Sequence, residues 1–336
     1  MNRRNFVKAA VTGTAAASVA APAIALAEEE KKIRLRMQTY WGKEADAVFA
    51  AFTSNVKTAS AGSLRIKRYP GGALVPDAEM LSAVSKGTLD MCESYGGYWP
   101  GKVDIATLES GIAGAWTNYD EATYIFRKGL LDAVREAYAE QNVHYIGAAL
   151  GGAYDLLTKK PVNSLDDLKN MKIRATPSVA KVLQKFDIPT VFMPASELYV
   201  GLSTGAIDGV IYGGPIEYTG MKLYEVAKYY TTLNMLMPGF TDCILINMDK
   251  WKSLSEAQQK ILEMGVAQHA ENEHAWLMEG SFDPKYTKNF EFSALSPEDA
   301  KRLREAATVL WDEEAAKSPR NKKVVDLLKS VAANRQ

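Results

Sequence analysis

Apolar and polar residues alternate in some segments of the chain and follow helical spacing in others. Residues 32–41, "KIRLRMQTYW", alternate as far as Met37 and predict a strand, whereas residues 45–58 place apolar side chains on one helical face. "SLRIKRYP", "NVHYIGAAL" and "DCILINMDKW" predict further strands, and "PSVAKVLQKFDIPTVFM" predicts a helix followed by a strand. Strands and helices that alternate in this way predict an α/β fold.

Capping signals place several helix starts. Ser255, with Gln258 three residues later, forms a capping-box pattern before a long helical segment. Ser-Pro pairs at 296–297 and 318–319 predict the starts of two more helices. Ser164 predicts the N-cap of a short helix, with Asp167 in its first turn, before the strand in "KIRAT".

Two segments of the chain resemble each other. They are "AEMLSAVSKGTLDMCESYGG" (78–97) and "SELYVGLSTGAIDGVIYGG" (196–214). The matching positions are Glu79/Glu197, Ser85/Ser203, Gly87/Gly205 and Asp90/Asp208, each followed by an apolar run and Tyr-Gly-Gly. Each copy predicts a core-facing helix, a glycine C-cap, and a strand that ends in an aromatic, glycine-containing loop. The repeat therefore predicts two similar lobes.

The aromatic loops have two interpretations. In open α/β sheets ligands bind beyond the carboxyl ends of strands, and both loops follow strands. Two facing lobes would then place "YGGYWPGK" (95–102) and "YGGP" (212–215) on opposite walls of one cleft. Alternatively, some rings cover a sheet edge as a small local core, so Tyr95, Tyr98 and Trp99 are not all expected to face a ligand.

The N-terminus has the pattern of an export signal. Arg3 and Arg4 precede an Ala-rich apolar run, and Ala25-Leu26-Ala27 fits the small-residue cleavage rule. Residues 1–27 are therefore predicted to be a cleavable twin-arginine signal peptide, which places the rest of the chain in the periplasm.

Composition excludes several classes of protein. Basic and acidic residues are equal at 40 each, so there is no electrostatic footprint for nucleic acid and no polybasic membrane patch. The only cysteines, Cys92 and Cys243, lie in apolar strand-like segments, where two buried thiols are at least as plausible as a disulfide. His269 and His274 are five residues apart, which is not the spacing of a helical zinc pair. "GLSTG" (201–205) matches Gly-x-Ser-x-Gly, but it lies at the end of a predicted helix and not in the strand-to-helix turn of a nucleophile elbow. Phosphate-loop and Cys-x-x-Cys motifs are missing from the sequence.

Arg174 is the only arginine between Glu136 and Lys301. It lies in "KIRATP", where a predicted strand leads into a helix that begins with proline. A guanidinium can hold a carboxylate through two parallel hydrogen bonds, which an ammonium cannot do. A surface salt bridge is the ordinary alternative. The position at a strand end favours a ligand-binding role.

Beyond residue 27 the whole chain resembles the periplasmic solute receptors of TRAP transporters, the DctP-type family. The resemblance rests on "SLDDLKNMKIR", "PASELYVGLSTGAIDG" and "YEVAKYYTT", and "LVPDAEMLSAVSKGTLDM", "YWPGK" and "YGGP" are most similar to the branch that binds 2-oxo acids. It implies an α/β, two-lobed periplasmic-binding-protein fold with a ligand cleft between the lobes and a long helix bridging them. Residues 28–152 with 241–282 would form one lobe, and 153–240 with 283–336 the other, including the C-terminal helices.

The resemblance also implies roles for individual residues. Arg174 would anchor the ligand carboxylate, and Tyr212, after the "DG" strand, would contact the ligand. Tyr95, Tyr98 and Trp99 would close over it from the first lobe. Tyr40, Trp41 and Tyr154 are further aromatic candidates for the pocket wall, and Trp116 is an additional one.

The sequence departs from the 2-oxo-acid branch at the position of its cation-holding Glu, which is Ile211 here. A Gln expected near Gly152 and Ala153 is missing too. Hard cations need several oxygen ligands, so we expect no metal and no cofactor. Tyr154 stands where other relatives carry a second arginine, which argues against dicarboxylates and sialic-acid-like ligands. The predicted ligand is a monocarboxylate, first an aromatic 2-oxo acid or a related aromatic acid or amino acid, then a small aliphatic 2-oxo or 2-hydroxy acid.

The expected partners are this ligand and the small and large subunits of a TRAP membrane permease. An exported enzyme and a structural protein are the competing classes, and the sequence offers no catalytic motif in its required structural context for the first. The last helix could pair with a second copy or pack on its own lobe, so both a monomer and a homodimer are consistent with the sequence.

Overall fold

The computed structural model describes residues 30–99 and 101–335 of the chain. All the described strands and helices lie within Lys32–Gln336, which forms one compact unit. The predicted signal peptide, residues 1–27, lies outside the described residues, and so does Pro100. Among the described helices, none has both the length and the apolar character that a membrane span requires.

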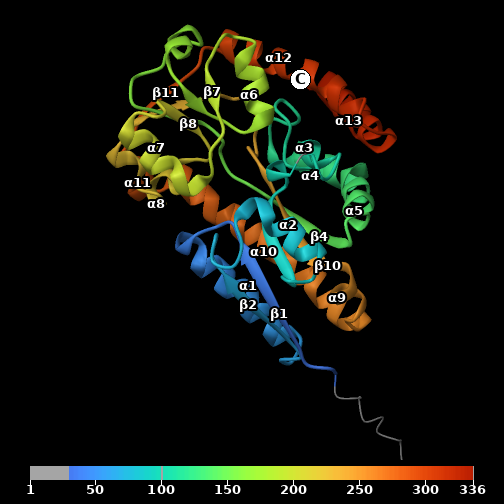
Figure 1. Cartoon of the computed structure of the whole chain (residues 1–336). Helices are drawn as coiled ribbons and strands as arrows, with labels where there is room; N and C mark the ends of the chain where they lie inside the picture. The colour runs from blue at the N-terminus through green and yellow to red at the C-terminus, as the bar shows by residue number, and fades with distance from the viewer. Residues whose placement is uncertain (1–29, 100, 336) are drawn as a thin grey trace, which may run out of the picture. The chain divides into compact units, whose positions relative to one another are not determined.

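Two mixed sheets organise the described residues (Figure 1). In the first, the order is β2-β1-β3-β10-β4, and in the second it is β11-β9-β5-β8-β6-β7. The first sheet contains β1 (Ile33–Thr39), β2 (Leu64–Tyr69), β3 (Met91–Tyr95), β4 (Val143–Leu150) and β10 (Thr241–Asn247). The second contains β5 (Leu156–Thr158), β6 (Ile173–Arg174), β7 (Thr190–Val191), β8 (Gly209–Ile211), β9 (Tyr229–Thr232) and β11 (Glu291–Ala294). These sheets confirm the α/β fold class.

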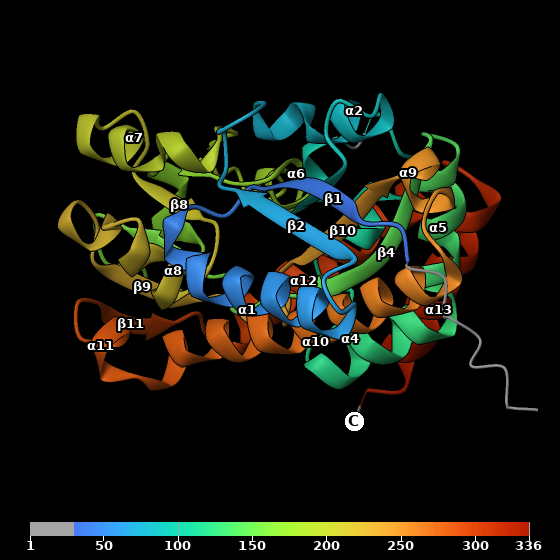
Figure 2. The ribbon, with the colours of Figure 1, turned by 90° about the horizontal axis from the view of Figure 1, so that it is seen from below.

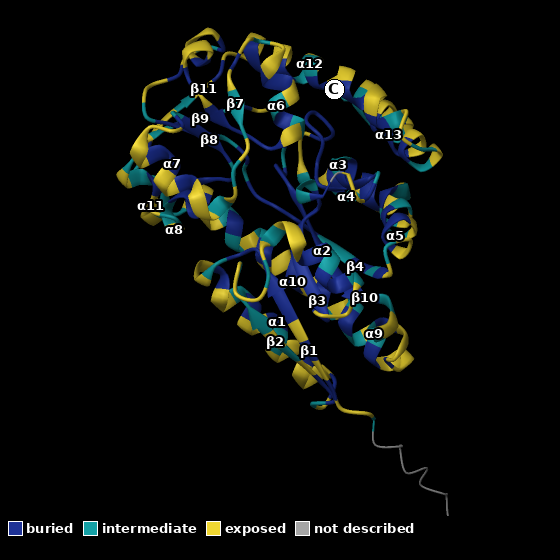
Figure 3. Cartoon of the chain, viewed as in Figure 1, coloured by how far each residue is buried: buried dark blue, intermediate teal, exposed yellow. Residues whose placement is uncertain are grey.

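Helices cover both sheets, with exposed outer faces and buried inner faces (Figure 3). The α-helices are α1 (Asp46–Ala59), α2 (Met80–Ser85), α3 (Ala106–Glu109), α4 (Tyr119–Ile125), α5 (Leu131–Ala139), α6 (Pro177–Gln184), α7 (Leu198–Thr204), α8 (Pro215–Gly220), α9 (Met248–Lys252), α10 (Glu256–Phe282), α11 (Pro284–Thr287), α12 (Pro297–Ala315) and α13 (Pro319–Ala333). Shorter helical turns are η1 (Lys43–Ala45), η2 (Asp77–Glu79), η3 (Gly96–Tyr98), η4 (Phe126–Leu130), η5 (Asp166–Asn170), η6 (Ala195–Glu197) and η7 (Leu223–Glu225).

The predicted repeat is present in the backbone. Each copy has a 3-10 turn (η2 or η6), a short helix (α2 or α7), a glycine and a strand (β3 or β8). Gly87 and Gly205 have φ values of 72° and 77°, a left-handed conformation that favours glycine. Each strand also lies between one parallel and one antiparallel neighbour. The similarity between the two segments is therefore structural as far as the strand, and beyond it β3 leads into η3 whereas β8 leads into α8.

Helix α10 spans the two sheets, as the resemblance implied. Its Ser255 side chain accepts from the Gln258 N–H, and the two residues form the predicted capping box. The helix packs against α1 and β4 of the first sheet and also against α8 and α11 (Figure 2). One continuous helix thus packs against elements that surround both sheets.

Two connecting segments, residues 151–155 and 233–240, cross between the sheets side by side. The Gly151 N–H donates to the Phe240 carbonyl at 2.9 Å, and the Gly239 N–H donates to the Gly152 carbonyl at 2.8 Å. A Cβ on Gly239 would lie 1.9 Å from the Tyr154 Cβ, so this close approach requires glycine. The assignment of residues to lobes agrees with these crossings but stays a prediction.

Helix α13 packs on α12 and also on α4 and α5. Its residues Val324, Val325 and Leu328 are buried within the chain itself. The apolar face of α13 therefore has an intramolecular partner.

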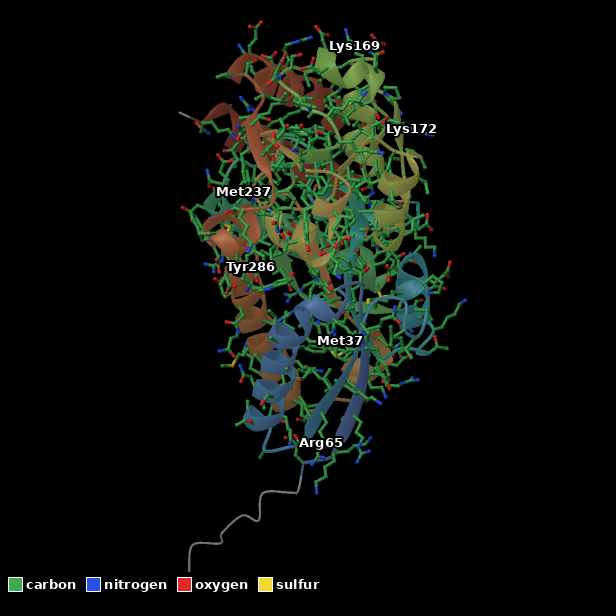
Figure 4. The ribbon with its side chains drawn as sticks, turned by 90° about the vertical axis from the view of Figure 1, so that its left-hand side faces the viewer. Met37, Arg65, Lys169, Lys172, Met237 and Tyr286 are labelled. Carbon is green, nitrogen blue, oxygen red and sulfur yellow. The ribbon has the colours of Figure 1, made fainter. Side chains whose placement is uncertain are left out.

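Met37 is buried in the first sheet, whereas Lys169 and Lys172 are exposed around η5 (Figure 4).

One sequence expectation changes in detail, and one alternative that the sequence left open is decided. The predicted helix after Ser164 is a 3-10 turn, and the Ser164 side chain does not cap it. Instead, Asp167 accepts from the N–H groups of Asn163 and Ser164, because a carboxylate can reach back over the turn. Cys92 and Cys243 are both buried free thiols, the first of the two alternatives.

Candidate functional site

A cavity of about 340 Å³, counting its open mouth, lies between the ends of the two sheets. Its lining residues are Tyr40, Trp41, Tyr95, Tyr98, Tyr154, Arg174, Thr176, Tyr212, Glu217 and Phe240. Seven of the eight ligand-binding residues predicted from sequence are in this set, and both aromatic loops contribute to it.

The topology explains why distant residues meet here. Tyr40 and Trp41 follow β1, and Tyr95 ends β3, which runs parallel to β1. Arg174 ends β6, and Tyr212 follows β8, which runs parallel to β6. The carboxyl ends of parallel strands meet at one edge of a sheet, so each sheet turns one such edge toward the cavity.

The Arg174 side chain is held in one orientation. Its Nε donates to the Met193 carbonyl at 3.1 Å, and its Nη1 donates to the Ile211 carbonyl at 2.9 Å. The guanidinium lies 5.3 Å from the centroid of the Tyr212 ring and 5.4 Å from that of Phe192. Two carbonyls and two rings therefore hold the guanidinium in place. Its remaining N–H donors are available to a group in the cavity.

No carboxylate of the described residues forms an ion pair with Arg174, although only 1% of its surface is exposed. A buried charge without a partner carries a large desolvation cost. The surface salt bridge considered at the sequence level is therefore wrong for this residue. The arrangement instead provides a buried cation that lacks an anion.

Aromatic rings form the walls of the cavity. The Tyr40 ring lies 4.8 Å from the Trp41 ring and 6.3 Å, edge to face, from the Tyr98 ring. Tyr98 in turn lies 6.3 Å from Phe192, which directly follows β7 of the second sheet. These distances are typical of favourable aromatic pairs, and the last pair joins the two walls.

Asp242 holds the Tyr40 and Trp41 rings, which belong to the cavity wall on the side of the first sheet, the first wall. Its Oδ2 accepts from the Tyr40 hydroxyl at 2.7 Å and from the Trp41 indole N–H at 3.2 Å. Burial, followed by the nearby Glu273 carboxylate, raises the pKa of Asp242 well above its usual value. Asp242 therefore orients two rings of the wall without lining the cavity.

The structure places two predicted aromatic residues elsewhere. The Trp99 indole donates to the Tyr138 hydroxyl at 3.0 Å, is almost fully buried, and does not line the cavity. The Trp116 indole donates to the Pro238 carbonyl at 2.7 Å and is also in the core. Trp99 thus has the local-core position that was its alternative, and a direct contact with ligand stays untested for it.

Sequence reasoning missed three lining residues, Thr176, Glu217 and Phe240. Thr176 accepts a hydrogen bond from the Tyr154 hydroxyl at 3.3 Å. Glu217 is three residues after Gly214 in "YGGPIE", a capping-box position that could have identified it. Phe240 comes directly before β10, and only the antiparallel pairing of β10 with β3 brings it to this edge.

A second buried group of polar residues lies beneath the first wall. His269 Nε2 is 2.8 Å from Glu93 Oε2 and 3.2 Å from Glu273 Oε2. One potential ligand atom from each residue lies within 4.8 Å of the others. Burial lowers the pKa of His269, but the two carboxylates outweigh it and raise that pKa to about 10. The imidazole is therefore charged and neutralises part of the buried acidic charge.

The comparison with curated proteins gives distant relatives. The chain is 27% identical over 243 residues to a monocarboxylate 2-oxoacid-binding periplasmic protein of Nostoc sp., covering 70% of this chain and 66% of that protein. It is 26% identical over 215 residues to a sialic acid-binding periplasmic protein of Vibrio cholerae, covering 62% and 64%. The alignment thus spans slightly less than two thirds of either relative.

A solved structure confirms the fold. A TRAP periplasmic solute-binding protein from Chromohalobacter salexigens, with bound (S)-(+)-2-amino-1-propanol, matches with a TM-score of 0.82 at 24% identity. The match covers 90% of this chain and 96% of that one. The family model of the bacterial extracellular solute-binding proteins, family 7 (DctP), matches residues 38–318. The chain therefore belongs to bacterial extracellular solute-binding protein family 7.

Proposed function

We propose that this protein is the periplasmic solute receptor of a TRAP transporter. In this role it binds a monocarboxylate organic acid with a flat hydrophobic group and delivers the acid to the membrane permease subunits. Family membership supports a solute-binding protein over an exported enzyme. The relatives described as binding a 2-oxo acid and sialic acid both bind carboxylates, which supports the ligand class.

The observation that carries the proposal is the buried, unpaired guanidinium of Arg174. Two of its N–H donors are used by backbone carbonyls, and an arginine has five. A ligand carboxylate would supply the missing anion through charge-assisted hydrogen bonds. Arg174 is the only Lys or Arg among the lining residues, so a single carboxylate is expected.

The aromatic lining supports a flat ligand. Tyr40, Trp41, Tyr98 and Tyr212 present ring surfaces to the same cavity as Arg174. Ring stacking contributes about 0.5–1.5 kcal/mol per pair beyond the burial of area. The leading ligand is an aromatic 2-oxo acid, or a related aromatic acid or amino acid. The alternative is a small aliphatic 2-oxo or 2-hydroxy acid.

The test is calorimetric titration with phenylpyruvate, phenylacetate, pyruvate and lactate, each beside its amide. We expect the phenyl-bearing acids to bind more tightly than pyruvate or lactate, and each amide to bind more weakly than its acid. An amide that binds as tightly as its acid would remove the role of Arg174. Turnover of any of these compounds would favour the enzyme instead.

A further inference from the structure

The cavity is lined by the carboxyl group of Glu217 as well as by the guanidinium of Arg174. Glu217, on α8, is 3% exposed, and its Oε2 accepts from the Gly214 N–H at 2.9 Å. Its Oε1 is buried and has no hydrogen-bond partner among the described residues. Buried polar atoms are almost always paired, so an unpaired carboxylate oxygen that lines a ligand cavity needs a donor.

The backbone fixes this carboxylate in place. A Cβ on Gly213 would lie 2.7 Å from the Glu217 carboxyl carbon, so only glycine leaves room for the side chain to fold back over the loop. The bond to Gly214 N–H then holds one oxygen and leaves the other free. The loop that carries Tyr212 thus also positions Glu217.

Two groups of opposite charge line the cavity. They are Arg174 and Glu217, and both act electrostatically on the Tyr212 hydroxyl. They are not joined in an ion pair. Asp242 and Glu273 approach the same region but do not line the cavity. A bound molecule can therefore satisfy a cation and an anion at separate points.

We infer that the ligand carries a protonated amine in addition to its carboxylate, so that it is an amino acid whose ammonium donates to Glu217 Oε1. This inference rests on the proposed function, since Arg174 must hold the carboxylate. A zwitterion matches a cavity with one positive and one negative group. A 2-oxo acid would place a carbonyl oxygen, a second acceptor, against the free oxygen of an ionised Glu217.

Protonation of Glu217 is the competing arrangement within the same cavity. Burial raises the pKa of the Glu217 carboxyl to about 7, despite the stabilising Gly214 N–H. A protonated Glu217 would donate to a keto oxygen and so accept a 2-oxo acid. Glu217→Gln separates the two, because its amide offers a neutral N–H donor at the same place. The substitution should weaken an amino acid and leave a 2-oxo acid unchanged or tighter.

The experiment is calorimetric titration at pH 7.5 with two matched series. One comprises phenylalanine, phenylpyruvate and 3-phenylpropionate, and the other alanine, pyruvate and propionate. In the wild type we expect the amino acid of at least one series to bind 10-fold or more tightly than both its partners. Glu217→Gln should remove that advantage while the melting temperature stays close to wild type. The matched control is Glu225→Gln, because Glu225 is an exposed glutamate that accepts from Tyr199. This control should keep the preference for the amino acid.

The outcomes separate the two proposals. If the carboxylates bind but the amine adds nothing, or if Glu217→Gln keeps the preference, the inference is wrong and the receptor function stands. If no member of either series binds, both the inference and the proposed ligand class are overturned.

Discussion

The Trp99 indole N–H donates to the Tyr138 hydroxyl, 39 residues away, at 3.0 Å. Tyr138 passes the interaction on by donating to Glu109 Oε2 at 3.2 Å, and Tyr145 donates to the other oxygen of Glu109 at 3.1 Å. All four side chains are buried. The aromatic loop after β3 is therefore anchored to the core by its tryptophan, while Tyr95 and Tyr98 line the cavity.

Trp99→Phe should lower stability and leave ligand affinity unchanged. The change removes a buried hydrogen bond and leaves the Tyr138 hydroxyl without its donor, which costs about 1–3 kcal/mol. Urea denaturation would measure the first effect and calorimetric titration the second. An affinity for aromatic acids that falls 10-fold, with small aliphatic acids unaffected, would instead place the Trp99 ring against the ligand.

Glu109→Gln should flatten the pH dependence of stability. Burial raises the pKa of Glu109 to about 8, although Tyr145 and Tyr138 donate to it. The folded state therefore keeps a proton that the unfolded state releases, so the contribution is complete below about pH 4.5 and is lost as pH rises toward 8. One proton changes the free energy of unfolding by up to about 1.4 kcal/mol per pH unit.

The measurement is urea denaturation at pH 5.5 and pH 7.5. The loss of stability between them should be smaller in Glu109→Gln by up to about 3 kcal/mol. Glu305→Gln, at an exposed position of α12, should behave like the wild type. Equal losses in all three proteins would show that Glu109 does not hold the proton.

Arg174→Ala should weaken binding of an acid by about 30-fold to several thousand-fold. Truncating one partner of a buried charge pair costs about 2–5 kcal/mol, and about 1.4 kcal/mol is one decade of affinity. Arg174→Lys should also fail, because one ammonium cannot replace the planar fork. Calorimetry with an acid and its amide would show the acid losing far more. Arg302→Lys, a half-exposed arginine on α12, is the control; lysine functioning in place of Arg174 would refute the prediction.

Ligand should shift the protein toward a closed arrangement of its two walls. The cavity takes residues from both sheets, so contacts from both sides favour the closed state over the open one. Small-angle scattering should give a smaller radius of gyration at saturating ligand. A radius that does not change, with binding verified separately, would exclude closure around the ligand.

His269→Leu should destabilise the protein by about 3–5 kcal/mol, because it leaves Glu93 buried without its cation. Urea denaturation at pH 7.5 would measure this loss. In the double variant with Glu93→Gln the cost should be well below the sum of the two single costs. Additive costs would show that Glu93 and His269 do not stabilise each other.

Local signals in the sequence determined much of this architecture. Alternation placed β1 and β2, the Ser255–Gln258 box placed the start of α10, and the paired glycines Gly87 and Gly205 placed two equivalent helix ends. These features depend on periodicity and on backbone conformations that few residues adopt, so they can be read from neighbouring residues alone. Arg174 could be selected in the same way, from its position at the end of a short strand.

Only the tertiary structure decided which side chains meet. Trp99 and Tyr98 are adjacent in sequence, yet one bonds to Tyr138 in the core and the other lines the cavity. The Glu217 carboxylate lies where Gly213 leaves space for it. His269 bonds to Glu93, which is on a strand 176 residues earlier. Such contacts depend on the packing of distant elements. The local pattern of a sequence therefore does not predict which buried charged group will lack a partner.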